Sequence, residues 1–130
     1  MKKTILTPQA PKPLGAYSQA VVHGGLAYLS GQIPLDPGSG NLIEGGVSQQ
    51  TERVLENIKA VLGACGASLD SVLKTTVFLK DMGDFNAMNQ VYQRYFATDP
   101  PARSTIQAAK LPRDVAVEID VIAAVTSQPA

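Results

Sequence analysis

The sequence has very few of the residues that build metal centres or thiol chemistry. Its 130 residues include one cysteine (Cys65), one histidine (His23) and no tryptophan. A single cysteine excludes an intrachain disulfide and is typical of a reducing compartment. One Cys and one His argue against a zinc site or a Cys–His nucleophile pair within the chain. Cys65 falls in a helical pattern, where packing explains it, and His23 precedes two glycines in a predicted turn. We expect no metal.

Net charge and long apolar runs are also absent. Eleven basic residues balance eleven acidic ones, so no overall field favours a nucleic acid or an anionic membrane. Zero net charge gives little protection against self-association, which favours an oligomer. The first residues, MKKTILTPQAPKP, contain no apolar run of signal-peptide length, and no stretch approaches the length of a membrane span. We therefore expect one cytoplasmic domain, residues 1–130, with neither a membrane nor a nucleic-acid partner.

The hydrophobic pattern predicts two helices among several strands. Residues 16–22 and 26–33 are predicted strands around a His-Gly-Gly turn, and residues 71–80 alternate and are β-branched. A helix is predicted after Ser48, its N-cap, and it ends near Gly63 and Gly66. A second helix is predicted after Asp84, and its aromatic stripe is interpreted as core packing. The apolar stripes of the two helices are Val54, Leu55, Ile58, Val61 and Leu62, and Phe85, Met88, Tyr92, Tyr95 and Phe96.

The segments 102–110 and 115–125 complete the order ββαβαββ. This order predicts an α+β two-layer sandwich, in which one sheet has both helices on one face. The Pro- and polar-rich tails, residues 1–13 and 126–130, are expected to be loosely held.

Alternation along the last two strands places polar side chains on one face. If the LPRD segment closes a hairpin, Arg103, Thr105, Gln107, Glu118 and Asp120 share the face away from the helices. In that register Glu118 lies about 13 Å along the strands from Arg103, at 3.3 Å per residue. The two side chains would then point into one cleft and contact different ends of a small molecule. A solvated polar face is the alternative interpretation.

Four motifs stand out along the chain: GAYSQA, LSGQIP, TTVFLKDM followed by FNAMNQVYQRYF, and PPARSTIQAAKLPRDVAVEID. By these motifs the sequence resembles the Rid (YjgF) family, the reactive intermediate/imine deaminases. The resemblance runs from about residue 4 to residue 124, and the motifs occur in the family's order. Within the family, the fourth motif resembles the RidA branch most.

The resemblance implies a chorismate-mutase-like fold with a mixed sheet, and a homotrimer with clefts between subunits. It implies that 2-imino acids released by pyridoxal-phosphate enzymes are hydrolysed to 2-oxo acids and ammonia, the activity of a 2-iminobutanoate/2-iminopropanoate deaminase. By motif, Arg103 would bind the substrate carboxylate, Glu118 would orient or deprotonate water, and Tyr17 would donate a hydrogen bond or close the cleft. Ser30 and Gly31 would line the pocket through backbone groups.

Further residues and departures concern the pocket lining. Asn89 and Thr105 are additional candidate substrate-binding residues. Thr105 stands where RidA proteins often have cysteine, Gln107 where glutamate is frequent, and Ala16 where proline is common. None of these departures touches Arg103, Tyr17 or Glu118, so they bear on substrate preference.

Planar, permanently charged guanidinium binds carboxylate bidentately, which suits Arg103 to the role of clamp. Imine hydrolysis needs neither a metal nor an organic cofactor. Three alternatives remain: a small-carboxylate or 2-oxo-acid sensor without turnover, a specialised enamine deaminase of a catabolic pathway, and an RNA-cleaving translation inhibitor. The balanced charge argues against the last of these.

Overall fold

A computed structural model describes residues 1–128 of the chain. Its strands and helices follow the order βββαβαββ, so one strand precedes those that the sequence predicts. Three short 3₁₀ turns lie at residues 69–71, 82–84 and 112–114. The elements are β1 (Lys3–Ile5), β2 (Ala20–His23), β3 (Leu26–Gln32), α1 (Val47–Cys65), β4 (Val72–Leu79), α2 (Phe85–Tyr95), β5 (Ala102–Gln107) and β6 (Val117–Ala124).

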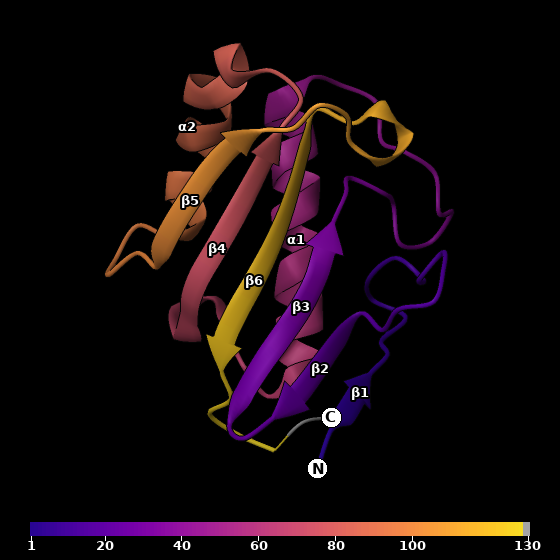
Figure 1. Cartoon of the computed structure of the whole chain (residues 1–130), viewed down its shortest axis with the longest axis vertical. Helices are drawn as coiled ribbons and strands as arrows, with labels where there is room; N and C mark the ends of the chain where they lie inside the picture. Colours follow the sequence, from indigo (N-terminus) through magenta and orange to yellow (C-terminus); the bar gives the residue numbers. More distant parts are fainter. Residues whose placement is uncertain (129–130) are drawn as a thin grey trace.

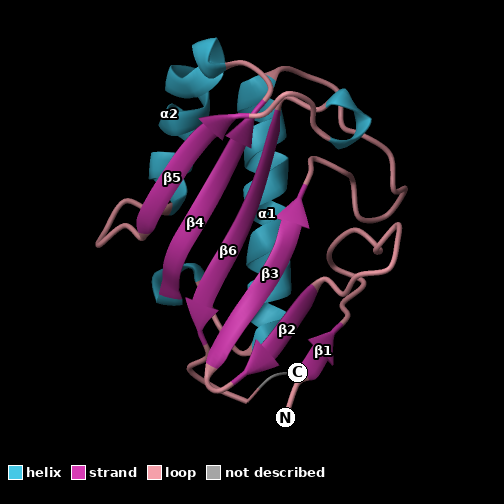
Figure 2. Cartoon of the chain, viewed as in Figure 1, coloured by secondary structure: helices cyan, strands magenta, loops and turns pink. Residues whose placement is uncertain are grey.

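The strands form a single mixed sheet with both helices on one face (Figures 1 and 2). The spatial order is β1-β2-β3-β6-β4-β5, and β4–β5 is the one parallel pair. This confirms the predicted two-layer α+β sandwich. The β2–β3 hairpin is confirmed as well, because Gly24 and Gly25 both adopt positive φ in its turn.

The core lies between α1, α2 and the covered face of the sheet. The buried stripe of α1 matches the predicted helical spacing and includes Cys65, whose thiol pKa burial raises to about 11. Cys65 is therefore a neutral packing residue, as the sequence indicates. The helix begins at Val47 rather than after Ser48, because Gly46 is its N-cap and the Gln49 side chain accepts the Gly46 N–H. The helix ends at Cys65, and its C-cap residue, Gly66, has a left-handed backbone conformation.

The second helix also begins close to its predicted start. Asp84 occupies the N-cap position of α2, but its side chain makes no capping hydrogen bond. Met88, Tyr92 and Phe96 are buried, which confirms core packing for these members of the predicted stripe.

The predicted hairpin between β5 and β6 is wrong. β6 lies between β3 and β4 and is antiparallel to both, whereas β5 is the edge strand and runs parallel to β4. Alternate residues of β6 are buried along its whole length, while most of β5 is exposed. A strand with a continuous apolar face gains most from a central position covered by helices, and the more polar strand takes the edge.

The corrected pairing also changes the predicted faces. In-register neighbours share a face, and Arg103 pairs with the fully buried Thr75 of β4 on the helix side. Thr105 and Gln107 follow Arg103 on that side. Glu118 pairs with Phe78 on the opposite, uncovered face. Arg103 and Glu118 therefore lie on opposite faces of the sheet, rather than on one.

The N-terminal tail is held more firmly than the sequence predicts. β1 pairs with β2 at the sheet edge, and the Gln19 side chain, which is 1% exposed, binds the following loop. Gln19 Oε1 accepts the Thr7 N–H at 2.7 Å, and Nε2 donates to the carbonyls of Thr7 and Pro11, both at 3.0 Å. The buried side-chain amide of Gln19 thus forms the hydrogen bonds that a neighbouring strand would otherwise form with the backbone of this loop. At the other end, residues 129–130 of the expected loose tail lie outside the described residues.

Replacing Gln19 by alanine should destabilise the fold by about 2–3 kcal/mol, because the substitution leaves a buried N–H and buried carbonyls without partners. The free energy of unfolding in urea and the exchange protection of the Thr7 amide should both fall. Gln9→Ala, on the exposed part of the same loop, serves as the control at equal protein concentration. Unchanged Thr7 protection in Gln19→Ala would contradict the assigned role.

Candidate functional site

Arg103 lies under α2, at the edge of the sheet. Its Nη1 donates a 2.7 Å hydrogen bond to Asn89 Oδ1. Its guanidinium carbon is 4.7 Å from the centroid of the Tyr92 ring and 5.3 Å from that of Phe85. These distances are within the range of cation–π attraction, so α2 supplies one polar and two aromatic contacts to the cation.

The spacing of these α2 residues explains how they reach one side chain. Phe85, Asn89 and Tyr92 stand at i, i+4 and i+7, and therefore lie on one stripe of the helix. Core packing alone does not describe this stripe, because two of its aromatic rings also face the guanidinium. An asparagine within an otherwise apolar helical stripe is the sequence signal that marks this contact. A cavity of about 470 Å³ adjoins it, lined by Asn89, Tyr92, Gln93, Phe96, Ala97, Pro100, Pro101 and Arg103.

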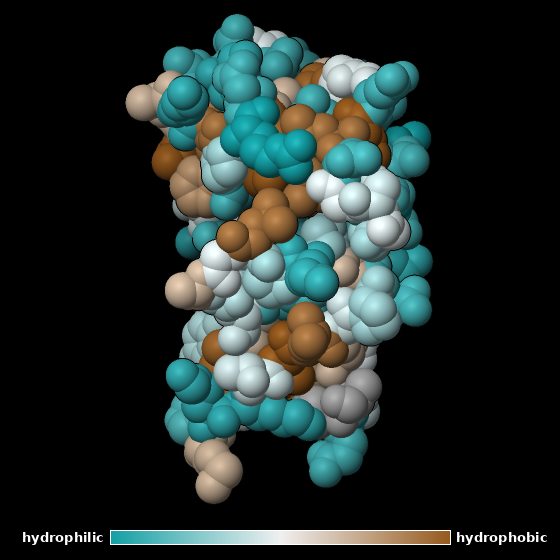
Figure 3. Space-filling view, turned by 90° about the vertical axis from the view of Figure 1, so that its right-hand side faces the viewer, coloured by the Kyte–Doolittle hydropathy of each residue, from teal (hydrophilic) through white to brown (hydrophobic). Residues whose placement is uncertain are grey.

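The other predicted site residues meet elsewhere. Tyr17, Ser30, Gly31 and Glu118 line a second cavity, of about 420 Å³. Its remaining lining residues are Leu14, Gly15, Ile33, Pro112 and Arg113. Figure 3 shows apolar surface left exposed among hydrophilic residues on the side of the molecule that lies at the right in Figure 1, where the loops project. Leu14 is 66% exposed and Tyr17 50% exposed, so the mouth of this cavity is apolar.

A β-bulge brings Glu118 against Gly31. From Leu29 to Gln32, β3 advances three residues while its partner β6 advances two, so one residue of β3 is extra. A Cβ atom on Gly31 would overlap the carboxylate of Glu118. The φ of Gly31 is not positive. The glycine is therefore needed for the space that Glu118 occupies, not for its backbone conformation.

The environment of Glu118 favours its protonated form. Burial raises the pKa of this carboxyl group, and the nearby negative charge of Asp120 raises the pKa further. A carboxylate whose pKa is raised is a stronger base than that of an ordinary glutamate, which suits a group that takes a proton from water.

Tyr17 and Ser30 have defined partners within the chain. The Tyr17 hydroxyl accepts the Leu14 N–H at 3.3 Å, and half of its side chain is exposed. Ser30 Oγ donates to the Ser18 carbonyl at 2.6 Å, and the Ser30 N–H donates to the Gln19 carbonyl at 3.0 Å. Ser30 thus lines the cavity, but its backbone N–H is already satisfied.

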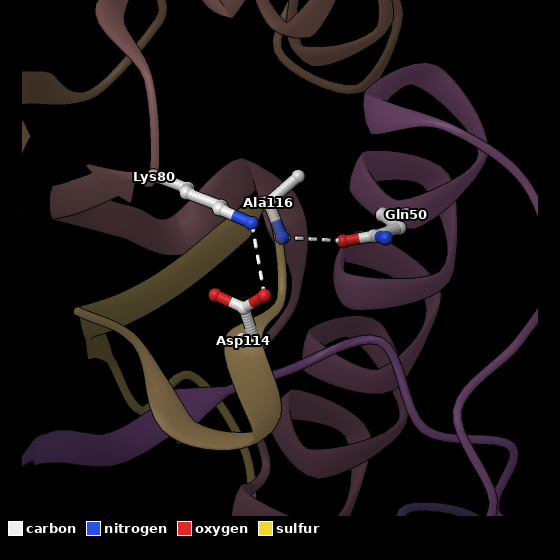
Figure 4. Close-up of polar contacts among 4 residues, drawn as sticks. All are labelled: Gln50, Lys80, Asp114 and Ala116. Atoms are coloured by element: carbon white, nitrogen blue, oxygen red, sulfur yellow. Dashed lines mark hydrogen bonds and ion pairs between the residues drawn. The ribbon is translucent and has the colours of Figure 1, made fainter.

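The sequence interpretation did not name Arg113, which lines the same cavity as Glu118. Both Arg113 and Asp114 have positive φ, which costs roughly 1–2 kcal/mol for each non-glycine residue. The loop is braced on both sides (Figure 4): Lys80 Nζ lies 2.9 Å from Asp114 Oδ2, and the Ala116 N–H donates to Gln50 Oε1 at 2.8 Å. Left-handed backbone at two consecutive non-glycine residues leaves no clear sequence signal.

The structure therefore divides the predicted site into two groups of residues. Arg103 and Asn89 lie in contact under α2, and Thr105 follows on the same face of β5 with its buried Oγ1 unpartnered. The second group, Tyr17, Ser30, Gly31 and Glu118, surrounds the other cavity. Within one chain the two groups are separated by the sheet.

Residues 1–128 contain no cluster of three or more His, Cys, Asp or Glu side chains placed to hold a metal ion. In the same part of the chain, none of the helices combines the length and apolarity needed to span a bilayer.

Comparison with known proteins gives consistent matches along nearly the whole chain. The family model described as endoribonuclease L-PSP matches residues 7–125. A RutC family protein of Pyrococcus horikoshii is 51% identical, over 95% of this chain and 98% of its own. The human 2-iminobutanoate/2-iminopropanoate deaminase is 42% identical, over 95% of this chain and 90% of its own. The crystal structure of RidA from an Antarctic Psychrobacter superposes with a TM-score of 0.91 at 43% identity, over 95% of this chain and 99% of that one.

The fold of the neighbours, the four motifs and the length of these matches agree with one another. The chain belongs to the endoribonuclease L-PSP family, the Rid (YjgF) family.

Proposed function

We propose that the protein hydrolyses 2-imino acids to 2-oxo acids and ammonia in the cytoplasm, as a 2-iminobutanoate/2-iminopropanoate deaminase. The observation that carries the proposal is the set of contacts that Arg103 makes. Its guanidinium is held by an amide oxygen and two aromatic rings, and among residues 1–128 no carboxylate forms an ion pair with it. A fixed cation without an internal counter-ion suits an anionic ligand. The name of the human relative supports a 2-imino acid as that ligand.

In the proposed reaction, Arg103 binds the substrate carboxylate and fixes the adjacent C=N carbon for attack. Glu118 accepts a proton as water adds to this carbon, which forms a carbinolamine. The same carboxyl group then delivers this proton to the nitrogen and accepts the proton of the new hydroxyl group, which it also passes to the nitrogen. The C–N bond breaks as the carbonyl forms, and ammonia leaves. One water is consumed, and one 2-oxo acid and one ammonia are produced. Tyr17 closes the cavity beside these groups.

The mechanism requires Arg103 and Glu118 to meet, and we propose that they meet between subunits of a homotrimer. In this arrangement the edge strand β5 of one subunit faces the cavity of its neighbour. The uncovered face of the sheet supports an assembly, because it exposes Tyr28 by 44% and Ile106 by 47%. Zero net charge also permits close association. Each cleft would then take its clamp from one subunit and its base from the next.

Two other functions remain candidates for the same site. A sensor of 2-oxo acids would use Arg103 in the same way without needing Glu118 as a base, and the raised pKa of Glu118 favours the catalytic function. A specialised enamine deaminase would differ in the side chain that the pocket accepts, on which Thr105 bears. Cleavage of RNA is disfavoured by the balanced charge.

A coupled assay tests the activity. A threonine dehydratase or an amino-acid oxidase generates the imino acid, and its loss is followed with and without the protein. We expect acceleration by the wild type and a fall in kcat/KM of about 100-fold in Arg103→Ala, because a charge-assisted clamp and its positioning effect are lost. Arg94→Ala, which removes an exposed arginine of α2, is the matched control. Binding of 2-oxo acids without any acceleration would favour the sensor.

Subunit mixing tests the shared cleft. Arg103→Ala and Glu118→Gln subunits, each strongly impaired alone, are co-expressed with different tags, and the mixed trimers are purified. One of the three clefts in every mixed trimer then combines a native Arg103 with a native Glu118, so the purified mixed trimers should regain about a third of the wild-type activity. Mixed trimers that stay as inactive as the two parents would refute a cleft built from two subunits.

The acid side of the pH profile tests Glu118. A base must be deprotonated to act, so kcat/KM should fall as the pH drops through the raised pKa of Glu118, above the ordinary glutamate value of about 4.3. Asp120→Asn removes a neighbouring negative charge and should shift this fall in kcat/KM to lower pH, while burial still holds the pKa of Glu118 above its usual range. If the fall does not shift in Asp120→Asn, or if it persists in Glu118→Gln, it is due to the titration of another group.

A further inference from the structure

The Arg103 guanidinium is stabilised mainly in ways that leave its hydrogen-bond donors available. A guanidinium group carries five N–H donors, and within residues 1–128 one hydrogen bond of this group is formed, from Nη1 to Asn89. The rings of Phe85 and Tyr92 contact the cation at 5.3 and 4.7 Å from their centroids. An aromatic face attracts a cation without accepting its N–H bonds as a carboxylate would. The remaining donors stay free for a ligand.

Of the two rings, that of Tyr92 is the more firmly held. Tyr92 is 4% exposed, and its hydroxyl lies 2.8 Å from Thr75 Oγ1 in a buried hydrogen bond. Thr75 is fully buried and pairs in register with Arg103 on the neighbouring strand. Phe96 packs against the same ring, with 4.7 Å between the ring centroids. A tilt of the Tyr92 ring would therefore break a buried hydrogen bond and disturb packing in the core.

We infer that Tyr92 is a positioning residue, which presents the Arg103 guanidinium to the substrate carboxylate, and that Thr75 fixes the orientation of its ring. This inference rests on the proposed function, because it assigns the carboxylate to Arg103. The connection runs from β4 through the Thr75 hydroxyl to α2, and from the Tyr92 ring to β5. It orders a long, flexible side chain at an edge strand before any ligand binds. Burial raises the pKa of the Tyr92 phenol, which keeps the ring neutral.

The first experiment compares variants of two tyrosines of α2, Tyr92 and Tyr95. Binding of 2-oxobutanoate, a product of the proposed reaction, is measured by calorimetry, and kcat and KM are measured with the corresponding imino acid. Tyr92→Leu should weaken binding and raise KM about ten-fold, with a smaller effect on kcat, while Tyr92→Phe keeps the ring but loses the hydrogen bond to Thr75 and should give an intermediate loss. Tyr95→Leu is the matched control, because it removes a hydrogen-bonded tyrosine of the same helix that makes no stacking contact with Arg103.

The second experiment removes the electrostatic contact without changing the core. Phenylalanine with increasing numbers of ring fluorines at position 92 weakens the attraction for a cation while it keeps the size of the ring. Affinity for 2-oxobutanoate should fall stepwise along this series. The series stays informative if Tyr92→Leu fails to fold, and constant affinity along it would overturn the inference.

A double-mutant cycle separates an effect through Arg103 from a general loss of packing. In an Arg103→Ala background, Tyr92→Leu should cause no further loss of binding. An equal loss in both backgrounds, or an equal loss in Tyr95→Leu, would overturn the positioning role. The outcomes also separate the two proposals. Binding that depends on Tyr92 without any turnover refutes the deaminase and leaves the positioning role intact, whereas a wild type that does not bind 2-oxobutanoate refutes both.

Discussion

The insertion of β6 between β3 and β4 is the constraint on which the rest of the structure depends. One face of β6 is a continuous apolar row, and burying that row under α1 and α2 requires a central position in the sheet. Its other face then presents Glu118 and Asp120 on the uncovered side. The same insertion moves β5 to the edge, where Arg103 contacts α2. Core packing thus determines the positions of Arg103 and Glu118, the two charged groups of the candidate site.

Glu118 and Arg103 are each held in place by different interactions. Gly31 leaves room for the Glu118 carboxylate at a bulge, and burial together with Asp120 raises its pKa. Arg103 is held by aromatic faces and an amide oxygen, which leave most of its donors free. Neither group is neutralised by an ion pair with the other in a single chain. In the proposed assembly, the substrate carboxylate binds the free donors of Arg103, and water binds the carboxyl group of Glu118.

Several features of the fold were readable from the sequence. The α1 stripe has helical spacing, the glycines after His23 mark a hairpin, and strict alternation in β6 separates its two faces. These patterns are local, because the helical and strand periods are properties of the backbone itself. Motif resemblance led to the family and to the candidate residues, and the comparisons confirm the family.

Strand order, and with it the division of the site, was decided only by the tertiary structure. The LPRD segment separates two strand-like sequences, and nothing local tells whether it closes a hairpin or crosses over the end of β4. That choice depends on competition for the central position, which the more apolar strand wins through contacts with helices distant in sequence. The sequence by itself determined both helices, most of the strands and the candidate residues of the site. The packing of those elements placed Arg103 and Glu118 on opposite faces, because burial is settled by the whole core and not by any one segment.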